Sequence, residues 1–135
     1  MKPDPGPGLA PGSAVVLIAD NDPGVSALLG EVLAMRGVAS ESVLDGEAAL
    51  QRLHRGGVRL LICDLDMPRL DGLGLLERLA LLPDPPAVVV VSGYVHPRVE
   101  GGLRANPVVR GIYAKPFDVV RFGDDVVEIL RGAAG

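Results

Sequence analysis

The sequence predicts an α/β domain: a doubly wound, five-stranded parallel sheet in the order 2-1-3-4-5, with helices on both faces. Three observations support this fold class. Short apolar runs alternate with stretches in which the apolar residues are spaced as on one face of a helix. Within the short runs, polar residues do not alternate with apolar ones. Valine, leucine and alanine supply most of the apolar content. Strands that are apolar throughout are covered on both faces. With 135 residues, 48% of them hydrophobic, one domain is expected.

Five apolar runs are the predicted strands, and each ends at a turn or at polar residues. They cover residues 14–19, 38–44, 58–63, 87–91 and 108–114. A helix is predicted between the first two runs, with Asp22 as its N-cap and Pro23 in its first turn. Its buried face is predicted from the i, i+3, i+4, i+7 spacing of Val25, Leu28, Leu29, Val32 and Leu33.

The remaining connections also read as helices, which completes the β/α alternation. Three of them are predicted over residues 45–55, 70–82 and 117–131. The fourth, between Tyr94 and Asn106, is expected to be short or mobile, because Pro97, Gly101 and Gly102 interrupt its apolar pattern.

Composition sets the domain limits and excludes several functions. Residues 1–13 are rich in proline and glycine and are expected to be a disordered tail. Residues 14–131 are expected to form the domain and residues 132–135 a short tail, with no output domain attached. A net charge of −4 argues against direct nucleic-acid binding, and the single Cys63 excludes an internal disulfide. No apolar run is long enough to span a bilayer, so a cytoplasmic location is expected.

Polar side chains follow four of the predicted strands. In an open parallel sheet, ligands bind beyond the carboxyl ends of the strands, so these side chains are expected to converge. They are Asp20 and Asn21 after the first strand, Asp64 and Asp66 after the third, Ser92 at the end of the fourth, and Lys115 after the fifth. An acid directly after an apolar strand gains nothing from burial without partners, which marks Asp64 as a functional residue.

The order and spacing of these groups resemble one known family. Asp20-Asn21-Asp22-Pro23, Asp64-Leu65-Asp66-Met67-Pro68, Ser92-Gly93 and Lys115-Pro116-Phe117 look like the motifs of the CheY-like receiver domain of bacterial response regulators. The resemblance spans residues 14–131 and implies a flavodoxin-like fold. It implies a stand-alone response regulator of two-component or phosphorelay signalling, not an enzyme acting on a separate substrate.

The resemblance also assigns roles to the acids. Asp64 would be the nucleophile that accepts a phosphoryl group from a histidine kinase or a histidine phosphotransfer protein. Mg²⁺ would be held by Asn21, Asp64 and the backbone carbonyl of Asp66, with Asp20 acting through a bound water. The family usually has a carboxylate where this chain has Asn21, so weakened magnesium binding is expected.

The later motifs imply a switch. Lys115 would contact the Asp64 carboxylate and then the phosphoryl oxygens, while Ser92 would donate its hydroxyl and draw the following loop inward. The family's second switch residue, usually aromatic, corresponds to Ile112. Tyr113 beside it would replace that residue only if the strand register differs, because neighbouring strand residues face opposite sides.

Two other functions stay open at this point. A receiver-like fold used only for protein binding would need no phosphorylation, and Asn21 and Ile112 are compatible with it. A haloacid-dehalogenase-type phosphatase would instead use Asp20 as its nucleophile, and would need a later acidic pair; Asp124-Asp125 falls within a predicted helix. The expected downstream partner is another protein, with the chain a monomer or a weak homodimer that binds no membrane.

Overall fold

A computed structural model describes residues 16–134, and its centre is a five-stranded parallel sheet in the order β2-β1-β3-β4-β5. This confirms the predicted fold class. The strands are β1 (Val16–Ala19), β2 (Ser40–Val43), β3 (Leu60–Asp64), β4 (Ala87–Ser92) and β5 (Val109–Ala114). The tail predicted over residues 1–13 lies outside the described residues.

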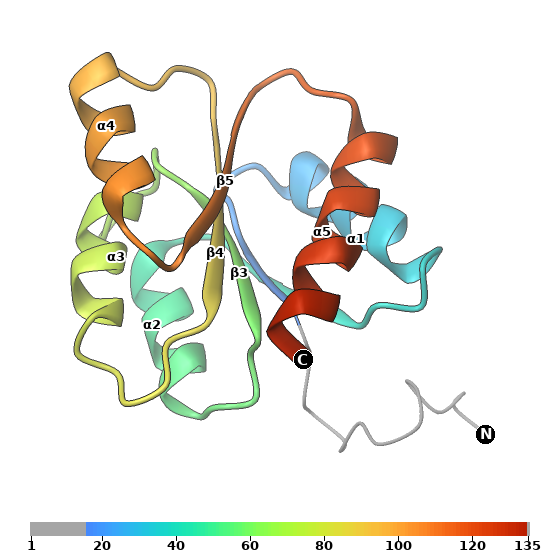
Figure 1. The fold of residues 1–135 in the computed structure, drawn as a ribbon, viewed down its shortest axis with the longest axis horizontal. Coiled ribbons are helices and arrows are strands. Elements are labelled where there is room, and N and C mark those ends of the chain that lie inside the picture. Colours follow the sequence, from blue (N-terminus) through green and yellow to red (C-terminus); the bar gives the residue numbers. More distant parts are fainter. Residues whose placement is uncertain (1–15, 135) are drawn as a thin grey trace.

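Five helices cover the two faces of the sheet (Figure 1). They are α1 (Pro23–Ala34), α2 (Gly46–His54), α3 (Gly72–Leu79), α4 (Pro97–Ala105) and α5 (Val119–Ala134). Helices α1 and α5 lie on one face, and α2, α3 and α4 lie on the other. Each strand sends alternate side chains to the two faces, which gives two apolar clusters separated by the sheet.

Local sequence explains the helix limits. Asp22 caps α1, accepting hydrogen bonds from the backbone N–H groups of Gly24 and Val25, as predicted. Asp71 caps α3 in the same way, so α3 begins at Gly72, later than the predicted residue 70. Helix α5 continues to Ala134 instead of ending at Arg131, because small residues with no proline follow it.

One predicted core position in α1 is wrong. Leu28 is 45% exposed, although the periodicity placed it on the buried face. The helix turns a stripe centred on Leu29, Val32 and Leu33 toward the sheet, and Ser26 takes the fourth buried position. A narrow helical stripe buries about three residues in two turns, so Leu28 at its margin stays in solvent.

Helix α4 spans Pro97–Ala105 and is no shorter than α2 or α3, so its length does not set it apart as predicted. Leu103 is its single buried side chain. Nothing lies within 4 Å of the Cβ that either Gly101 or Gly102 would carry. The helix therefore contacts the body of the domain along a narrow line.

Candidate functional site

Two buried carboxylates lie side by side at the carboxyl end of the sheet. Strands β1 and β3 are neighbours, with Ala19 opposite Cys63, so the next residues, Asp20 and Asp64, emerge together. Asp20 is fully buried and Asp64 is 3% exposed. The sequence predicted this convergence, and the strand order produces it.

Lys115 joins the two acids from the end of β5. Its Nζ lies 2.8 Å from Asp20 Oδ2 and 3.5 Å from Asp64 Oδ2. Its backbone N–H donates to the carbonyl of Ser92 at 2.8 Å, and its peptide bond to Pro116 is cis. The ammonium therefore contacts both acids and lies closer to Asp20.

The loops that follow the two strands orient the carboxylates. Asp20 Oδ1 accepts from the N–H of Asp22 at 2.9 Å, and Asp64 Oδ1 accepts from the N–H of Asp66 at 3.0 Å. Gly72 lets the start of α3 approach this loop, since a Cβ there would lie 2.6 Å from the Asp64 carbonyl oxygen. Each carboxylate thus has one oxygen held by its own loop and the other directed at Lys115.

Two acids and one ammonium leave the buried cluster with a negative charge. Burial raises the pKa of Asp64, and the Asp20 charge adds to this, against the opposing Asp66 N–H and Lys115. Burial lowers the pKa of Lys115, but its hydrogen bonds and attraction to Asp20 and Asp64 outweigh burial and raise that pKa overall. The cluster therefore attracts a further cation.

The other predicted metal ligands lie at the rim. Asn21 and Asp66 are exposed, and the Asp22 side chain caps α1. Within residues 16–134 no group of three or more His, Cys, Asp or Glu side chains forms a ready metal cage. Two buried carboxylates and a rim amide still fit Mg²⁺, which is commonly held by one or two carboxylates together with phosphate oxygens and water.

Ser92 is buried at the end of β4, and its hydroxyl is already engaged. Its Oγ donates to the carbonyl of Tyr94 at 3.1 Å, within its own loop. The structure places this side chain on the strand next to Asp64, since Asp64 pairs with Val91. To donate elsewhere, the hydroxyl has to rotate out of the turn.

The two predicted switch residues face opposite sides of β5. Ile112 packs on the cluster that includes Leu103 of α4, whereas Tyr113 packs on the α1–α5 side. The β4–β5 register shifts between Val88 and Val89, but this irregularity does not bring Tyr113 to the α4 side. Tyr113 is therefore no substitute for an aromatic residue at position 112.

Cys63, directly before Asp64, has no place in the chemistry. It is fully buried, and burial, helped by the Asp64 charge, raises its pKa to about 12. The thiolate is the reactive form of cysteine, so this thiol is inert near neutral pH.

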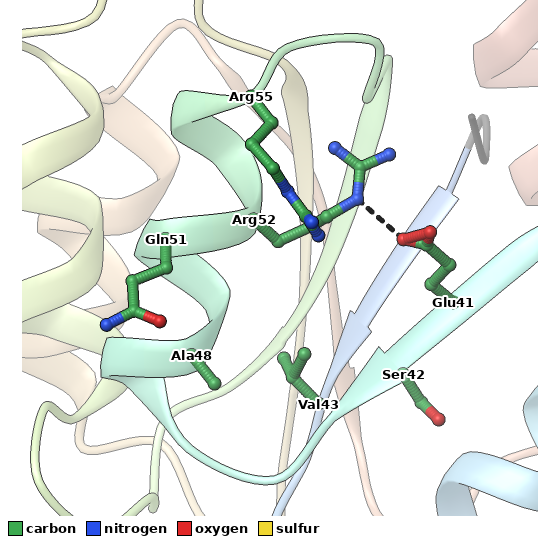
Figure 2. A pocket seen from close by; sticks show the side chains of 7 residues that line it. All are labelled: Glu41, Ser42, Val43, Ala48, Gln51, Arg52 and Arg55. Carbon is green, nitrogen blue, oxygen red and sulfur yellow. Dashed lines mark hydrogen bonds and ion pairs between the residues drawn. The ribbon is translucent and has the colours of Figure 1, made fainter. Parts of the chain in front are cut away.

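Sequence reasoning missed a buried arginine away from these acids. Arg52 of α2 is 5% exposed, and its Nε lies 2.5 Å from Glu41 Oε2 on β2 (Figure 2). Its Nη1 donates to the Gly56 carbonyl. A pocket of about 620 Å³ opens beside this pair, and neither Asp20 nor Asp64 lines it. No sequence signal separates Arg52 from an ordinary solvent-facing arginine on a helix. The pocket is lined by Glu41, Ser42, Val43, Ala48, Gln51, Arg52 and Arg55.

The chain belongs to the response regulator receiver domain family, whose model matches residues 16–124. This confirms the resemblance that the sequence motifs indicated and identifies a receiver of two-component signalling. It excludes the phosphatase alternative; in addition, Asp124 and Asp125 lie within α5 and not after a strand.

Curated relatives carry this domain in different settings. The chain is 32% identical over 124 residues to protein-glutamate methylesterase/protein-glutamine glutaminase 1 of Anaeromyxobacter dehalogenans, covering 87% of this chain and 35% of that protein. It thus spans about a third of that relative's length. It is 26% identical over 120 residues to sporulation initiation phosphotransferase F of Bacillus subtilis, covering 85% of this chain and 92% of that protein.

Solved structures show the same fold. A CheY-like receiver domain of Methanospirillum hungatei JF-1 matches with a TM-score of 0.81 at 20% identity, covering 90% of this chain and 97% of that one. The response regulator TrrA of Thermotoga maritima, in complex with Mg²⁺ and BeF, matches with a TM-score of 0.72 at 23% identity, covering 84% and 96%.

Proposed function

We propose that Asp64 is the residue of this receiver that accepts the phosphoryl group, from a phosphohistidine on a histidine kinase or a histidine phosphotransfer protein. The observation that carries the proposal is the burial of Asp64 beside Asp20 and Lys115, at the carboxyl end of β3. Burial raises the pKa of the Asp64 carboxylate, which leaves its anion less stabilised and favours its action as a nucleophile.

In the transfer, a carboxylate oxygen of Asp64 attacks phosphorus, and the bond from phosphorus to the imidazole nitrogen breaks. The electron pair of that bond stays on the imidazole, and Asp64 becomes an acyl phosphate. Negative charge gathers on the phosphoryl oxygens, and Lys115, 3.5 Å from Asp64 Oδ2, neutralises part of it. The hydroxyl of Ser92 turns from Tyr94 to these oxygens.

The residues present fit Mg²⁺ as the second neutralising charge. Asp20, Asp64, Asn21 and the backbone carbonyl of Asp66 would hold it, and when bound it supplies positive charge next to the phosphoryl oxygens. A receiver neighbour binds Mg²⁺ with BeF. In this chain Lys115 pairs with Asp20, and Asn21 adds no charge, so we expect modest affinity for the metal.

An apolar pocket beside Lys115 suits the approach of the phosphodonor protein. It measures about 420 Å³ and lies between α1 and the loop that follows β5, where Leu28 is 45% exposed. A donor that delivers a phosphohistidine to Asp64 has to cover this rim. The pocket is lined by Val25, Leu28, Leu29, Lys115, Pro116, Phe117 and Val119.

The output of the switch is proposed to be protein binding in the cytoplasm and not catalysis on a separate substrate. Ser92 connects through its loop to α4, and Ile112 packs on the same side. None of the helices described here is both long and apolar enough to cross a membrane. The proposed route therefore runs from Asp64 to Ser92 and the α4 surface, where a downstream protein would bind.

The test is incubation of the protein with acetyl phosphate and MgCl₂, followed by intact-mass measurement. We expect the mass of one phosphoryl group to be added, and we expect Asp64→Asn to abolish the addition. Asp66→Asn is the matched control, since the exposed Asp66 contributes only its backbone to the site; it should be labelled like the wild type. Absence of labelling in the wild type would favour a phosphorylation-independent binding module.

A second measurement tests the metal assignment. Asn21→Asp adds a carboxylate at the rim, and we expect it to tighten Mg²⁺ binding about tenfold, the effect of one added charge at a partly exposed site. Calorimetric titration measures the change, and Asp22→Asn, which alters an exposed cap, is the control. Equal affinities for wild type and Asn21→Asp would remove residue 21 from the metal site.

A further inference from the structure

The loop that carries Lys115 is flanked by two aromatic residues that touch each other. Tyr113 precedes Lys115 and Phe117 follows it, and their ring centroids lie 5.8 Å apart. Both rings pack on Phe122 of α5, with centroid distances of 5.0 Å from Tyr113 and 4.9 Å from Phe117. Phe122 is fully buried, so the residues on both sides of the Lys115–Pro116 turn pack on a core side chain.

The hydroxyl of Tyr113 adds a directional tie to α5. It donates to Asp125 Oδ2 at 2.6 Å, a short hydrogen bond to a charged acceptor. Burial, then this hydrogen bond, raises the pKa of Tyr113 to about 12, so the group stays a donor across the neutral range. The ring contacts and this hydrogen bond are together called the Tyr113 clamp.

The Tyr113 clamp affects where the Lys115 ammonium lies. Lysine has a long, flexible stem, so the place of its Nζ depends on where the backbone of the turn is held. The backbone N–H of Lys115 donates to Ser92 on one side, and the residues on either side of the turn are held to α5 by the clamp. The loops after β1 and β3 orient the two carboxylates, and the clamp holds the backbone from which the ammonium reaches them.

We propose that Tyr113 is a positioning residue: with Asp125 it fixes the Lys115–Pro116 turn so that the ammonium reaches both carboxylates. This inference rests on the proposed function only for its effect on phosphoryl transfer. It assigns a role to Asp125 of α5, which the sequence alone did not indicate. It also gives Tyr113 a function on the α5 side of the sheet, opposite the predicted switch surface.

Two variants remove the hydrogen bond between Tyr113 and Asp125, and one keeps it. Tyr113→Phe keeps the ring and removes the donor, and Asp125→Ala removes the acceptor. Asp125→Asn keeps an oxygen that accepts the same hydrogen bond. Asp124→Ala is the neighbouring control, because Asp124 is paired with Arg36 of α1 and not with Tyr113.

The first measurement is hydrogen exchange of the Lys115 amide, followed by NMR. We expect Tyr113→Phe and Asp125→Ala each to raise its exchange rate about tenfold, the effect of one lost charge-assisted hydrogen bond. The double variant should exchange no faster than either single variant, and Asp124→Ala should match the wild type. Asp125→Asn should fall between the wild type and Asp125→Ala, because an amide oxygen accepts a weaker hydrogen bond than a carboxylate. No change at Lys115, or an equal rise at β1 amides, would overturn the proposal.

The second measurement is the initial rate of labelling by acetyl phosphate, normalised to the folded fraction. We expect a several-fold fall in Tyr113→Phe and Asp125→Ala, and a smaller fall in Asp125→Asn, which keeps a neutral acceptor. If the wild type is labelled and the two variants keep its rate, the clamp has no part in transfer and the inference fails. If the wild type is not labelled, the proposed function fails, and hydrogen exchange alone decides whether the clamp holds the turn.

Discussion

The two helices that flank β5 are held to the domain very differently. Helix α5 buries Phe122, Val126 and Leu130 and is tied to α1 by Arg36, which donates to the Val120 carbonyl and pairs with Asp124. Helix α4 buries Leu103 alone. The fixed side carries the turn that places Lys115, and the loosely held side follows Ser92. Under the proposed function, the loosely held side is the one expected to change when Asp64 is phosphorylated.

The largest expected effect is on stability and tests this asymmetry directly. Phe122→Ala removes a fully buried ring from the aromatic cluster, and we expect it to lower the free energy of unfolding by about 3–5 kcal/mol. Leu103→Ala should lower it by about 2 kcal/mol, because α4 can settle into the space. Urea denaturation of both variants measures the difference. Equal losses would mean that α4 is as firmly packed as α5.

Glycines in the two helices should respond in opposite directions. A Cβ at Gly123 of α5 would lie 2.6 Å from Val32 Cγ1, so Gly123→Ala should cost about 1–2 kcal/mol through overpacking. A Cβ at Gly101 of α4 meets nothing within 4 Å, so Gly101→Ala should stabilise the domain by about 0.5–1 kcal/mol. Thermal unfolding of the pair provides the test, and a shift of the same sign in both would contradict it.

The smallest expected effect on stability is that of replacing Asp64, at the end of β3. Its pKa is raised in the folded protein, so the folded state binds this proton more readily than the unfolded chain, and ionised Asp64 lowers stability. We expect Asp64→Asn to be slightly more stable than the wild type at neutral pH, because the amide carries no charge to desolvate. The gain should shrink as the pH falls toward the unfolded-state value of about 4. Chemical denaturation across this range, with Asp66→Asn as the unaffected control, measures it.

Much of the site was predictable because it depends on strand ends. Apolar runs that stop at Asp20, Asp64, Ser92 and Lys115 placed four chemical groups at one edge of a parallel sheet. The fold brings Asp20, Asp64 and Lys115 into contact, while the Ser92 hydroxyl bonds to its own loop. The weak helix between Tyr94 and Asn106 was predictable for a similarly local reason, its proline and glycines. These features follow from residue type and order alone.

Other features were not predictable because they depend on partners distant in the sequence. Leu28 fits the helical period of α1, yet it lies at the margin of the buried stripe. Arg52 is buried because Glu41 on β2 pairs with it, and Asp125 accepts from Tyr113 across the space between α5 and β5. Each depends on how far one element is rotated against another, which residue spacing does not specify.

By itself, the sequence determined the β/α alternation, the parallel sheet and the set of groups at its carboxyl end, because hydrophobic periodicity and strand ends are local properties. Only the tertiary structure decided how Lys115 is shared between Asp20 and Asp64, which side of β5 Tyr113 occupies and which helix holds the turn. Those depend on distances of a few ångströms between side chains far apart along the chain, which packing, hydrogen bonds and ion pairs of the folded domain set together.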